Sequence, residues 1–480
     1  MKQAIAIVDL GGNSRIAILD LQGNILSYWQ KKSEYFPDPE YPGGVSFDPR
    51  KWQEDIFGAM KKVLVEAGDV ELVAVTSSSQ REGIVLIGHD GEPVAGYPNS
   101  DFRGIEFAAQ IDWKTVMELS TLPVKPIYSA IKIYGMMQRH PEVIEKTKYI
   151  CSISDWVGYL LTGKVVWEKT QAMHSAVYNI YEDAWSEKLC QVFQVPPQIL
   201  PPLADSGEIL GAVTEEASRR TGIPAGTKFI VGGADTQLAI AGVGAKKGDI
   251  IPINGTTTPI MTIVDEIKTG NVWMSPTVTG ENYLLEINTG ITGTNVDTLC
   301  KTMAAGADWK EGFDHAEQMF ASGKLPNCTA VFSYNLFSGE DFLKYGSFVL
   351  NNPLTGMTDW KDMLYAMIMN VAFVIKVGLD IIKPHVKEEG RLVGIGGGFS
   401  GSVAAQTLAD ITGQDVYIME TSRQATIYGC YNVCCCTLGL PEMEQKIKHV
   451  YKARKSPDIE KYYEKWSAIK KGLLPINQNF

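Results

Sequence analysis

The sequence lacks an excess of basic residues, and this absence excludes several kinds of partner. It has 44 Lys and Arg against 55 Asp and Glu, which gives a formal net charge of -11 at pH 7. A protein that binds nucleic acid or an anionic membrane surface usually presents a basic patch to the phosphates. We therefore expect neither nucleic acid nor a membrane among its partners.

Segments that would direct the chain out of the cell or into a bilayer are also missing. The apolar run at the N-terminus, IAIV, stops at Asp9 and the glycines after it, before a signal-peptide core would be complete. The longest apolar stretch, Met363–Ile382, is interrupted by Asn370, Lys376 and Asp380, which is typical of a buried helix and not of a bilayer span. The sequence predicts a cytoplasmic location.

Cysteine patterns that bind zinc are absent too. The chain has eight cysteines and six histidines, and no Cys-x-x-Cys pair lies at zinc-ligand spacing from a histidine. The run YGCYNVCCCTLGL holds Cys430, Cys434, Cys435 and Cys436. It could bind a metal, but its apolar neighbours favour small buried side chains on a helix.

What the sequence does contain is a folded chain of ordinary composition. Hydrophobic residues make up 45% of the 480 residues and charged residues 21%, far from the signature of disorder. A single core rarely grows to this size, so we expect two domains. The Gly-rich, charged segment AGVGAKKGD lies near the middle of the chain. It places the predicted limits at 1–244 and 245–480.

Two segments share a pattern of strand, Gly-rich turn and strand. Residues 4–29 predict a strand, the turn GGNS, a second strand, the turn QGN and a third strand. Residues 249–264, DIIPINGTTTPIMTIV, repeat the first part of this pattern. Because helical and strand patterns alternate through the rest of the chain, the fold class is α/β, with two related domains.

The two Gly-rich turns could bind phosphate. Glycines let backbone N–H groups approach an anion closely, and Asp9 stands beside the first turn, where a carboxylate can hold Mg²⁺ through water. The second turn offers Asn254, Gly255, Thr256 and Thr257 as donors. An ordinary hairpin turn, with Asp9 as a turn former, explains the first motif equally simply.

A third Gly-rich segment, IGGGFSGSVAAQ, permits two interpretations. Gly396, Gly398 and Gly401 match the G-x-G-x-x-G motif of NAD-dependent oxidoreductases, and Glu420 follows at about the expected spacing. Too little chain follows the motif to complete such a sheet. A nucleoside packed on these glycines fits a kinase as well.

Taken together, these segments resemble the FGGY family of carbohydrate kinases, a branch of the actin-like, ribonuclease-H-like ATPases. The matching segments are, in order along nearly the whole chain, DLGGNSRIAILD, SSSQREGIVL, PNSDFRG, ISDWVGYLLTG, VGGADTQLAIAGVG, INGTTTPI and GIGGGFSGSVAAQTLADITGQDV. Within the family, QREGIVL, SDWVGYLLTG and GGADTQL are most similar to autoinducer-2 kinases, and xylulose and glycerol kinases are more distant. The resemblance implies two actin-like domains with a catalytic cleft between them.

The resemblance also implies a role for each matched residue. Asp235 matches the general base, and Gln80, Arg81 and Glu82, with Asp235, match the sugar-binding residues. Asp9 matches the metal-side carboxylate, and Asp101 with Arg103 resembles an internal supporting pair. The residues that match the ATP site are Gly11, Gly12, Asn13, Gly255, Thr256, Gly397 and Gly398.

The implied activity is ATP- and Mg²⁺-dependent phosphorylation of a hydroxyl on a small sugar or polyol, either autoinducer-2-like or a ketopentose such as xylulose. Phosphoryl transfer needs in-line positioning, Mg²⁺ across the phosphates and a carboxylate near the attacking hydroxyl. Two alternatives stay open at this point, namely a weak or silent sugar-binding sensor and an NAD-dependent oxidoreductase. A homodimer is possible.

One segment departs from the family pattern, and one residue has no assigned role. Most members have Asp-x-Gly-Thr-x-Ser-x-Arg where this chain has DLGGNSR, so the hairpin between Asp9 and Arg15 is one residue shorter. Activity could therefore be slow or altered. His174 could be either a sugar contact or a surface residue.

Overall fold

The computed structural model of the protein describes residues 2–270, 272–333, 347–351 and 358–477. The chain forms two compact units, each of which is assembled from separate segments. The first unit comprises residues 1–244, 265–284 and 424–444, and the second comprises 245–264, 285–423 and 445–480.

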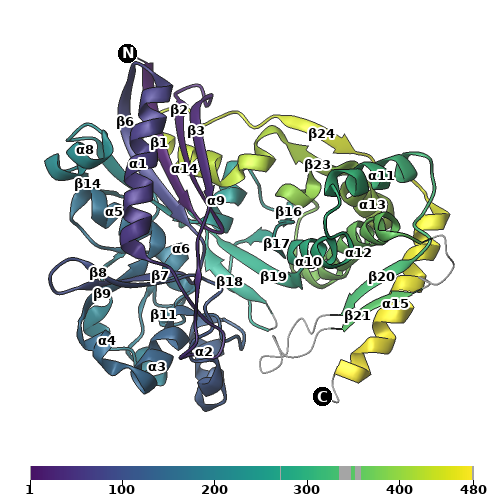
Figure 1. Cartoon of the computed structure of the whole chain (residues 1–480), viewed down its shortest axis with the longest axis horizontal. Helices are drawn as coiled ribbons and strands as arrows, with labels where there is room; N and C mark the ends of the chain where they lie inside the picture. The colour runs from purple at the N-terminus through teal and green to yellow at the C-terminus, as the bar shows by residue number, and fades with distance from the viewer. Residues whose placement is uncertain (1, 271, 334–346, 352–357, 478–480) are drawn as a thin grey trace. The chain divides into compact units, whose positions relative to one another are not determined.

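The first unit is built on a six-stranded sheet in the order β14-β15-β6-β1-β2-β3 (Figure 1). Strands β1, β2 and β3 are antiparallel neighbours, as expected for residues 4–29, whereas β1 pairs in parallel with β6, and β6 with β15. The strands of this sheet are β1 (Lys2–Leu10), β2 (Asn13–Asp20), β3 (Ile25–Lys32), β6 (Val70–Ser79), β14 (Ile209–Ala212) and β15 (Lys228–Ala234).

Short sheets and helices surround this core. The remaining strands of the unit are β4 (Phe36–Asp38), β5 (Gly44–Ser46), β7 (Ile84–Gly88), β8 (Pro93–Tyr97), β9 (Thr147–Ser152), β10 (Trp167–Glu168), β11 (Tyr178–Asn179), β12 (Ala184–Trp185), β13 (Leu203–Ala204) and β18 (Trp273–Pro276). Its α-helices are α1 (Pro49–Ala67), α2 (Trp113–Ser120), α3 (Ser129–Arg139), α4 (Pro141–Glu145), α5 (Ile153–Thr162), α6 (Lys169–Met173), α7 (Glu187–Val192), α8 (Glu215–Thr221), α9 (Asp235–Gly242) and α14 (Ala425–Leu438).

Both faces of β1 are buried, which explains its nearly unbroken apolar sequence. Side chains alternate between the two faces of a strand. Ala4, Ala6 and Val8 therefore join the core on the side of α1 and α5, while Ile5 and Ile7 join the core on the side of α9 and α14. Figure 1 shows helices on both faces of this sheet.

The ends of α1 show how local sequence defines an element. Asp48 caps the first turn by accepting the N–H groups of Arg50 and Lys51, and Pro49 has the φ angle that a first helical residue needs. Gly68 ends the helix with φ 77°, in the left-handed region that favours glycine. The sequence Asp-Pro followed later by Gly is therefore sufficient to bound this helix.

Asp101 and Arg103 form an internal support, as the resemblance implied. The Arg103 Nε donates to Asp101 Oδ2 at 2.7 Å, and the guanidinium lies over the ring of Tyr97. Both charged side chains are buried. Their partners are protein groups, so they hold the loop after β8 in place.

The second unit has the sheet order β19-β17-β16-β22-β23-β24. Its strands are β16 (Ile250–Pro252), β17 (Thr257–Val264), β19 (Tyr283–Ile291), β20 (Thr329–Ser333), β21 (Ser347–Asn351), β22 (Leu392–Val393), β23 (Val416–Met419) and β24 (Ile447–Tyr451). Its α-helices are α10 (Gly293–Met303), α11 (Trp309–Ala321), α12 (Trp360–Ile382), α13 (Ser402–Thr412) and α15 (Pro457–Asn477). The turn between β16 and β17 is the second predicted Gly-rich hairpin.

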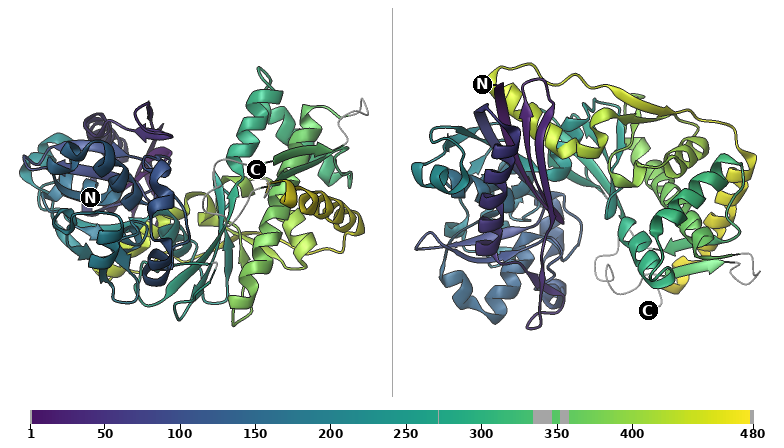
Figure 2. Two further views of the ribbon diagram at one scale, coloured as in Figure 1. Left: turned by 90° about the horizontal axis from the view of Figure 1, so that it is seen from below. Right: turned by 45° about the horizontal axis from the view of Figure 1, so that its top comes forward.

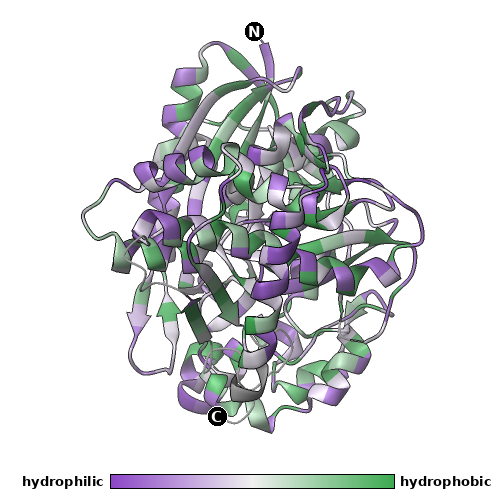
Figure 3. Cartoon of the chain, turned by 90° about the vertical axis from the view of Figure 1, so that its right-hand side faces the viewer, coloured by the Kyte–Doolittle hydropathy of each residue, from purple (hydrophilic) through white to green (hydrophobic). Residues whose placement is uncertain are grey.

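Helix α12 is the apolar stretch that the sequence assigned to a buried helix. By length and composition the segment Trp360–His385 could cross a membrane, but most of it is buried in the second unit, as in the core helices of water-soluble proteins. Asn370 within it accepts from Trp466 Nε1 of α15 at 2.9 Å. Helix α15 also packs beside β20 (Figure 2), and the helices in Figure 3 alternate hydrophobic and hydrophilic segments, as helices buried on one side do.

The return of α14 to the first unit differs from the predicted contiguous limits of 1–244 and 245–480. Helix α14 packs closely on α9, and two glycines permit the approach. A Cβ at Gly242 would lie 1.8 Å from the Ala425 carbonyl oxygen, and one at Gly429 would lie 1.9 Å from the Leu238 carbonyl oxygen. No break in composition marks this packing in the sequence.

Replacing Gly429 with alanine tests this contact. Because the new Cβ would collide with the backbone of α9, we expect Gly429→Ala to lower the free energy of unfolding by about 1–3 kcal/mol. A lower urea midpoint, followed by circular dichroism, is the measurement. Gly58→Ala is the control, because Gly58 lies inside α1 with no atom within 4 Å of its Cβ position. A Gly429→Ala midpoint as high as that of Gly58→Ala would contradict the close packing.

Candidate functional site

Three parallel strands of the first unit end at the same level. Leu10 of β1 and Ala234 of β15 both pair with Ser79 at the end of β6. The N–H of Gln80 then donates to the Leu10 carbonyl at 2.8 Å, so the segments that follow these strands lie side by side. In parallel sheets this edge is where ligands usually bind.

Asp235 begins α9 directly after β15. Its Oδ1 accepts from the Thr236 N–H at 2.7 Å and from the Thr236 hydroxyl at 3.2 Å. Burial raises the pKa of Asp235 to about 6, the negative charge of Asp9 adds to this, and Arg81 opposes it. The predicted base is therefore a carboxylate that takes up a proton more readily than an ordinary aspartate.

Asp9 is already paired with a positive charge. It lies opposite Arg15 in the β1–β2 register, and the Arg15 Nη2 forms an ion pair with Asp9 Oδ2. Burial nevertheless raises the pKa of Asp9, although Arg15 opposes the effect. Only 2% of Asp9 is exposed, so its charge acts on Asp235 through a poorly hydrated interior.

The hairpin after Asp9 is a two-residue turn at Gly11 and Gly12. The Gly11 N–H donates to the Asn13 carbonyl at 3.2 Å, and the Gly11 carbonyl accepts from the hydroxyls of Ser33 and Tyr35 at 2.6 and 2.9 Å. Gly12 and Asn13 are exposed. The turn is thus held by the segment that follows β3, and its tip is exposed to solvent.

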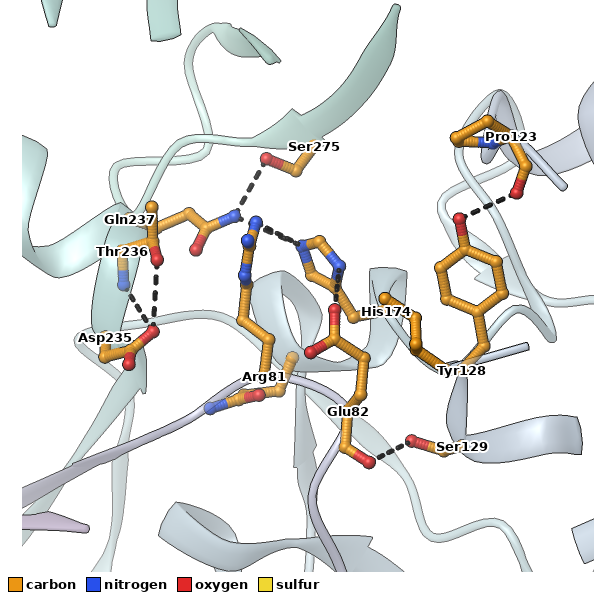
Figure 4. Close-up of polar contacts among 12 residues, drawn as sticks. Arg81, Glu82, Pro123, Tyr128, Ser129, His174, Asp235, Thr236, Gln237 and Ser275 are labelled. Atoms are coloured by element: carbon orange, nitrogen blue, oxygen red, sulfur yellow. Dashed lines mark hydrogen bonds and ion pairs between the residues drawn. The ribbon is translucent and has the colours of Figure 1, made fainter. Parts of the chain in front are cut away.

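Two of the predicted sugar-binding residues, Arg81 and Glu82, meet His174, which lies at the end of α6 (Figure 4). The His174 Nδ1 is 3.1 Å from Glu82 Oε1, and its Nε2 is 3.4 Å from both Arg81 Nη1 and Gln237 Nε2. Burial alone would raise the pKa of Glu82, but His174 and Arg81 together lower it. Because His174 is only 1% exposed, the surface alternative for this residue is wrong.

Glu82 has a left-handed backbone with φ 59°, which is unfavourable for a residue other than glycine. Helix α3 supports this conformation: the Ser129 hydroxyl and the Lys132 Nζ both donate to the Glu82 carbonyl, at 3.3 and 3.0 Å. Lys132 also donates to the Ile127 carbonyl at 2.8 Å, and burial lowers its pKa to about 8. A strained residue that is held this firmly is typical of a functional site.

The short helix α6 connects these parts of the site. Glu168 accepts the N–H groups of Thr170 and Gln171 at 2.9 and 3.0 Å, and burial raises its pKa to about 8. The Thr170 hydroxyl accepts from the Ala234 N–H, one residue before Asp235, at 2.9 Å. The Gln171 amide donates to the Ser79 carbonyl, one residue before Gln80, at 3.0 Å.

The second unit contains a separate cavity of about 810 Å³. Its lining includes all four of the ATP-site residues that were predicted in this half of the chain, namely Gly255, Thr256, Gly397 and Gly398. Asn254 joins the two glycine segments: its carbonyl accepts from the Gly398 N–H at 3.0 Å, and a Cβ at Gly398 would lie 2.1 Å from the Asn254 side chain. The remaining residues that were predicted to bind ATP belong to the first unit, namely Gly11, Gly12 and Asn13.

The N-terminus of α13 contradicts the oxidoreductase alternative. In a dinucleotide-binding fold the helix after the Gly-rich turn presents its free N–H groups to the pyrophosphate. Here Glu317 of α11 occupies that position, and its Oε1 accepts from the N–H groups of Ser402 and Val403 at 2.8 and 3.3 Å. A negative carboxylate at this helix end would repel the phosphates of NAD.

The described residues contain no group of three or more His, Cys, Asp or Glu side chains arranged to hold a metal. Cys430, Cys434 and Cys435 are buried on α14 and lie in an apolar core, as expected for small side chains on a buried helix. Mg²⁺ needs fewer protein ligands, because one or two carboxylates suffice when substrate phosphates complete its coordination. Asp9 and Asp235 therefore fit a Mg²⁺–phosphate complex and do not fit a protein-only metal site.

Comparison with known proteins identifies the family. Residues 4–242 match the N-terminal domain of the FGGY family of carbohydrate kinases, and residues 253–437 match its C-terminal domain. The chain belongs to this family. It is 32% identical over 466 residues to "Putative sugar kinase YoaC" of Bacillus subtilis, which covers 96% of this chain and 95% of the relative.

Two further relatives are more distant. The chain is 25% identical over 495 residues to an autoinducer-2 kinase of Photorhabdus laumondii, covering 95% of this chain and 92% of the relative. The fold matches the crystal structure of ligand-bound xylulose kinase from Lactobacillus acidophilus with a TM-score of 0.82 over 100% of both chains, at 20% identity. The protein is therefore a sugar phosphotransferase with the two-domain, actin-like FGGY kinase fold, and the oxidoreductase alternative is wrong.

Several residues of the site were not found from the sequence. Lys132, Glu168, Gln237 and Glu317 lie outside the matched motifs or carried no assigned role. The contact of Lys132 with Glu82 spans 50 residues of sequence, that of Gln237 with His174 spans 63, and that of Glu317 with Ser402 spans 85. Periodicity and local motifs carry no signal for contacts of this kind.

Replacing Glu317 tests its role at the end of α13. We expect Glu317→Ala to lower the free energy of unfolding by about 1–3 kcal/mol, because two partly buried N–H groups lose a charged acceptor. Thermal unfolding is the measurement. Glu311→Ala on the same helix is the matched control, since its ion pair with Lys361 is exposed and should contribute less than about 1 kcal/mol. Equal effects of the two substitutions would contradict the capping role.

Proposed function

We propose that this kinase transfers the terminal phosphoryl group of ATP to a hydroxyl of a small sugar or polyol, with Asp235 as the general base. The observation that carries the proposal is Asp235 itself: a carboxylate at the meeting point of three parallel strand ends, with its pKa raised to about 6. A base whose pKa lies near the working pH both exists in the ionised form and accepts a proton readily.

The residues around Asp235 suit the recognition of hydroxyl groups. Arg81 can only donate hydrogen bonds and the ionised Glu82 can only accept them, so together they can satisfy the acceptor and donor sides of neighbouring hydroxyls. Gln80 offers both functions from its amide. An alcohol ionises too weakly at neutral pH, so Asp235 would remove its proton as negative charge builds on the attacking oxygen.

The Gly-rich segments suit the recognition of nucleotide. A cavity of about 810 Å³ is large enough for a nucleoside with phosphates, and its glycines leave the backbone open to close contact. We assign Gly255 and Thr256 to the terminal phosphates and Gly397 and Gly398 to the adenosine. We assign Gly11, Gly12 and Asn13, around the exposed tip of the first hairpin, to phosphate binding as well.

Asp9 and Asp235 would supply the negative charge beside the metal. Bound Mg²⁺ would neutralise charge on the transferred phosphoryl group. Because Arg15 already pairs with Asp9, we assign Asp9 a contact through water and not a direct bond. A cytoplasmic location and a homodimer remain predictions.

The substrate class is best narrowed by a direct screen. The names of the relatives include an autoinducer-2 kinase and a xylulose kinase, so we propose an autoinducer-2-like compound or a ketopentose such as xylulose. The test is a coupled assay of ADP release over pentuloses, polyols and the autoinducer-2 precursor with Mg-ATP. Release that depends on one of these compounds supports the proposal, whereas release from none of them contradicts it.

A silent sugar sensor is the second candidate, and the short hairpin at Gly11 and Gly12 favours it. A shorter turn places fewer backbone donors near the phosphates. If the protein is a sensor, a sugar should raise its melting temperature in a thermal-shift assay without any release of ADP from Mg-ATP. Any sugar-dependent turnover above the hydrolysis of ATP alone excludes this candidate.

Asp235→Asn removes the base while preserving the shape of the side chain. We expect at least a 100-fold loss of kcat, in line with the usual contribution of a positioned base, and little change in nucleotide affinity. Steady-state kinetics and a nucleotide-binding titration measure the two effects. Asp69→Asn, at an exposed site, is the control. Full activity of Asp235→Asn would exclude this mechanism.

The pH dependence of the reaction follows from the same carboxylate. Its pKa is raised to about 6, and the base must be ionised to act. Activity should therefore be at a plateau above about pH 7 and fall about ten-fold per pH unit well below pH 6. The measurement is kcat/KM for the sugar between pH 5 and 8 at saturating Mg-ATP. A plateau that continues to pH 5 would contradict the assignment.

A further inference from the structure

We propose that His174 is a positioning residue of the sugar site, which acts as a neutral ring protonated on Nδ1 and holds Arg81 and Glu82 in the orientation that binds hydroxyls. This inference rests on the proposed function. It goes beyond the family motifs, because His174 lies outside the segments that carry the resemblance. The argument starts from the tautomer of the ring.

The tautomer follows from the partners of the two ring nitrogens. Nε2 is 3.4 Å from Arg81 Nη1, and a guanidinium can only donate. Nε2 must then be the unprotonated acceptor. Nδ1 then carries the proton, and it lies 3.1 Å from Glu82 Oε1 of the ionised carboxylate. The Gln237 amide, 3.4 Å from Nε2, provides a second donor on the acceptor side.

A neutral ring in this place keeps the charge of the site balanced. His174 lies between a cation and an anion, and it pairs with both without adding a charge of its own (Figure 4). The orientations of the Arg81 guanidinium and the Glu82 carboxylate are thereby tied to one ring.

The ring itself is held rigidly. His174 caps the C-terminal end of α6, and Glu168 caps the N-terminal end of the same helix through Thr170 and Gln171. Gln171 ties the helix to the Ser79 carbonyl at 3.0 Å. A short helix with both ends anchored can fix a side chain to within the tolerance that substrate orientation requires.

Glu82 is held from the other side by its backbone. Its carbonyl accepts from Ser129 and Lys132 of α3, which stabilises the left-handed φ of 59°. Helix α3 therefore sets the backbone of Glu82, and His174 sets the direction of its carboxylate. Without the ring, the backbone of Glu82 would stay in place while its carboxylate lost this contact.

A hydrogen-bonded chain continues from His174 to a distant segment. Gln237 Nε2 also lies 3.0 Å from the Ser275 hydroxyl, and both residues are buried. Ser275 belongs to β18, which lies in the segment 265–284 of the first unit. The acceptor side of the ring is thereby fixed by two elements, α9 and β18.

Two substitutions of His174 test the contacts of its two ring nitrogens separately. In His174→Asn an amide N–H can replace the Nδ1 donor to Glu82, and in His174→Gln an amide oxygen can replace the Nε2 acceptor for Arg81. We expect each to raise the KM for the sugar by about 10- to 100-fold, the range for a lost hydrogen bond to a charged group. The KM for ATP should change by less than about two-fold. The fold-change in kcat should be smaller than the fold-change in the KM for the sugar. Steady-state kinetics on the full chain, with the sugar found in the screen, measure all three.

The same substitutions at His140 are the matched controls. His140 also contacts carboxylates, with Nε2 2.9 Å from Glu40 and Nδ1 3.1 Å from Glu142, but it is 37% exposed and takes no part in the site. His140→Asn and His140→Gln should leave the sugar KM unchanged. An unchanged sugar KM in both His174 variants would overturn the inference.

A spectroscopic measurement decides the tautomer without any substitution. With ¹⁵N-labelled histidine, the six rings should include one neutral ring protonated on Nδ1 whose resonances shift when the sugar is added. If no such ring is found, the inference is wrong even when the enzyme is active. If no sugar is phosphorylated, the proposed function fails, and the tautomer still tests the arrangement around His174.

Discussion

The parallel pairing of β1, β6 and β15 is the constraint on which the site depends. Parallel strands bring their carboxyl ends to one edge, so Leu10, Ser79 and Ala234 lie at one level although they are far apart in the sequence. Each strand is followed at once by a segment that holds predicted site residues. A slip of one residue in either pairing would turn the alternate side chains to the other face and separate these segments. Backbone hydrogen bonds therefore place Asp235 near Asp9 and Arg81.

Burial gives these charged groups their chemical character. Water-poor surroundings raise the pKa of Asp235 to about 6 and lower that of Lys132 to about 8, because each charged form loses hydration. Neighbouring side chains then shift the pKa values of individual groups further. The pKa of Glu82 is lowered because His174 and Arg81 outweigh the effect of burial. The same aspartate on an exposed loop would be an ordinary acid. The apolar helices on both faces of the sheet are therefore part of the chemistry as well as of the core.

Elements that depend on residues close together in the sequence were predicted correctly, whereas contacts between residues far apart in the sequence were not predicted. The β-meander at residues 4–29, the hairpin at residues 249–264 and the long helix near residue 370 follow from alternation, glycine turns and apolar periodicity, all of which are local. The returning helix α14 was missed because only Gly242 and Gly429, 187 residues apart, reveal its contact with α9. His174 was noticed without a role, because nothing near it in the sequence indicates that Glu82 and Arg81 lie against its ring.

The sequence alone determined that this is a two-domain α/β sugar kinase, because the phosphate-binding turns, the GGAD segment and their order along the chain can be recognised directly in the amino-acid sequence. The tertiary structure decided what each group can do. It showed that Glu317 closes the helix end that a dinucleotide would need, and that His174 lies buried between Arg81 and Glu82. Protonation state, hydrogen-bond direction and strain depend on neighbours supplied by other elements, and those neighbours exist only once the chain has folded.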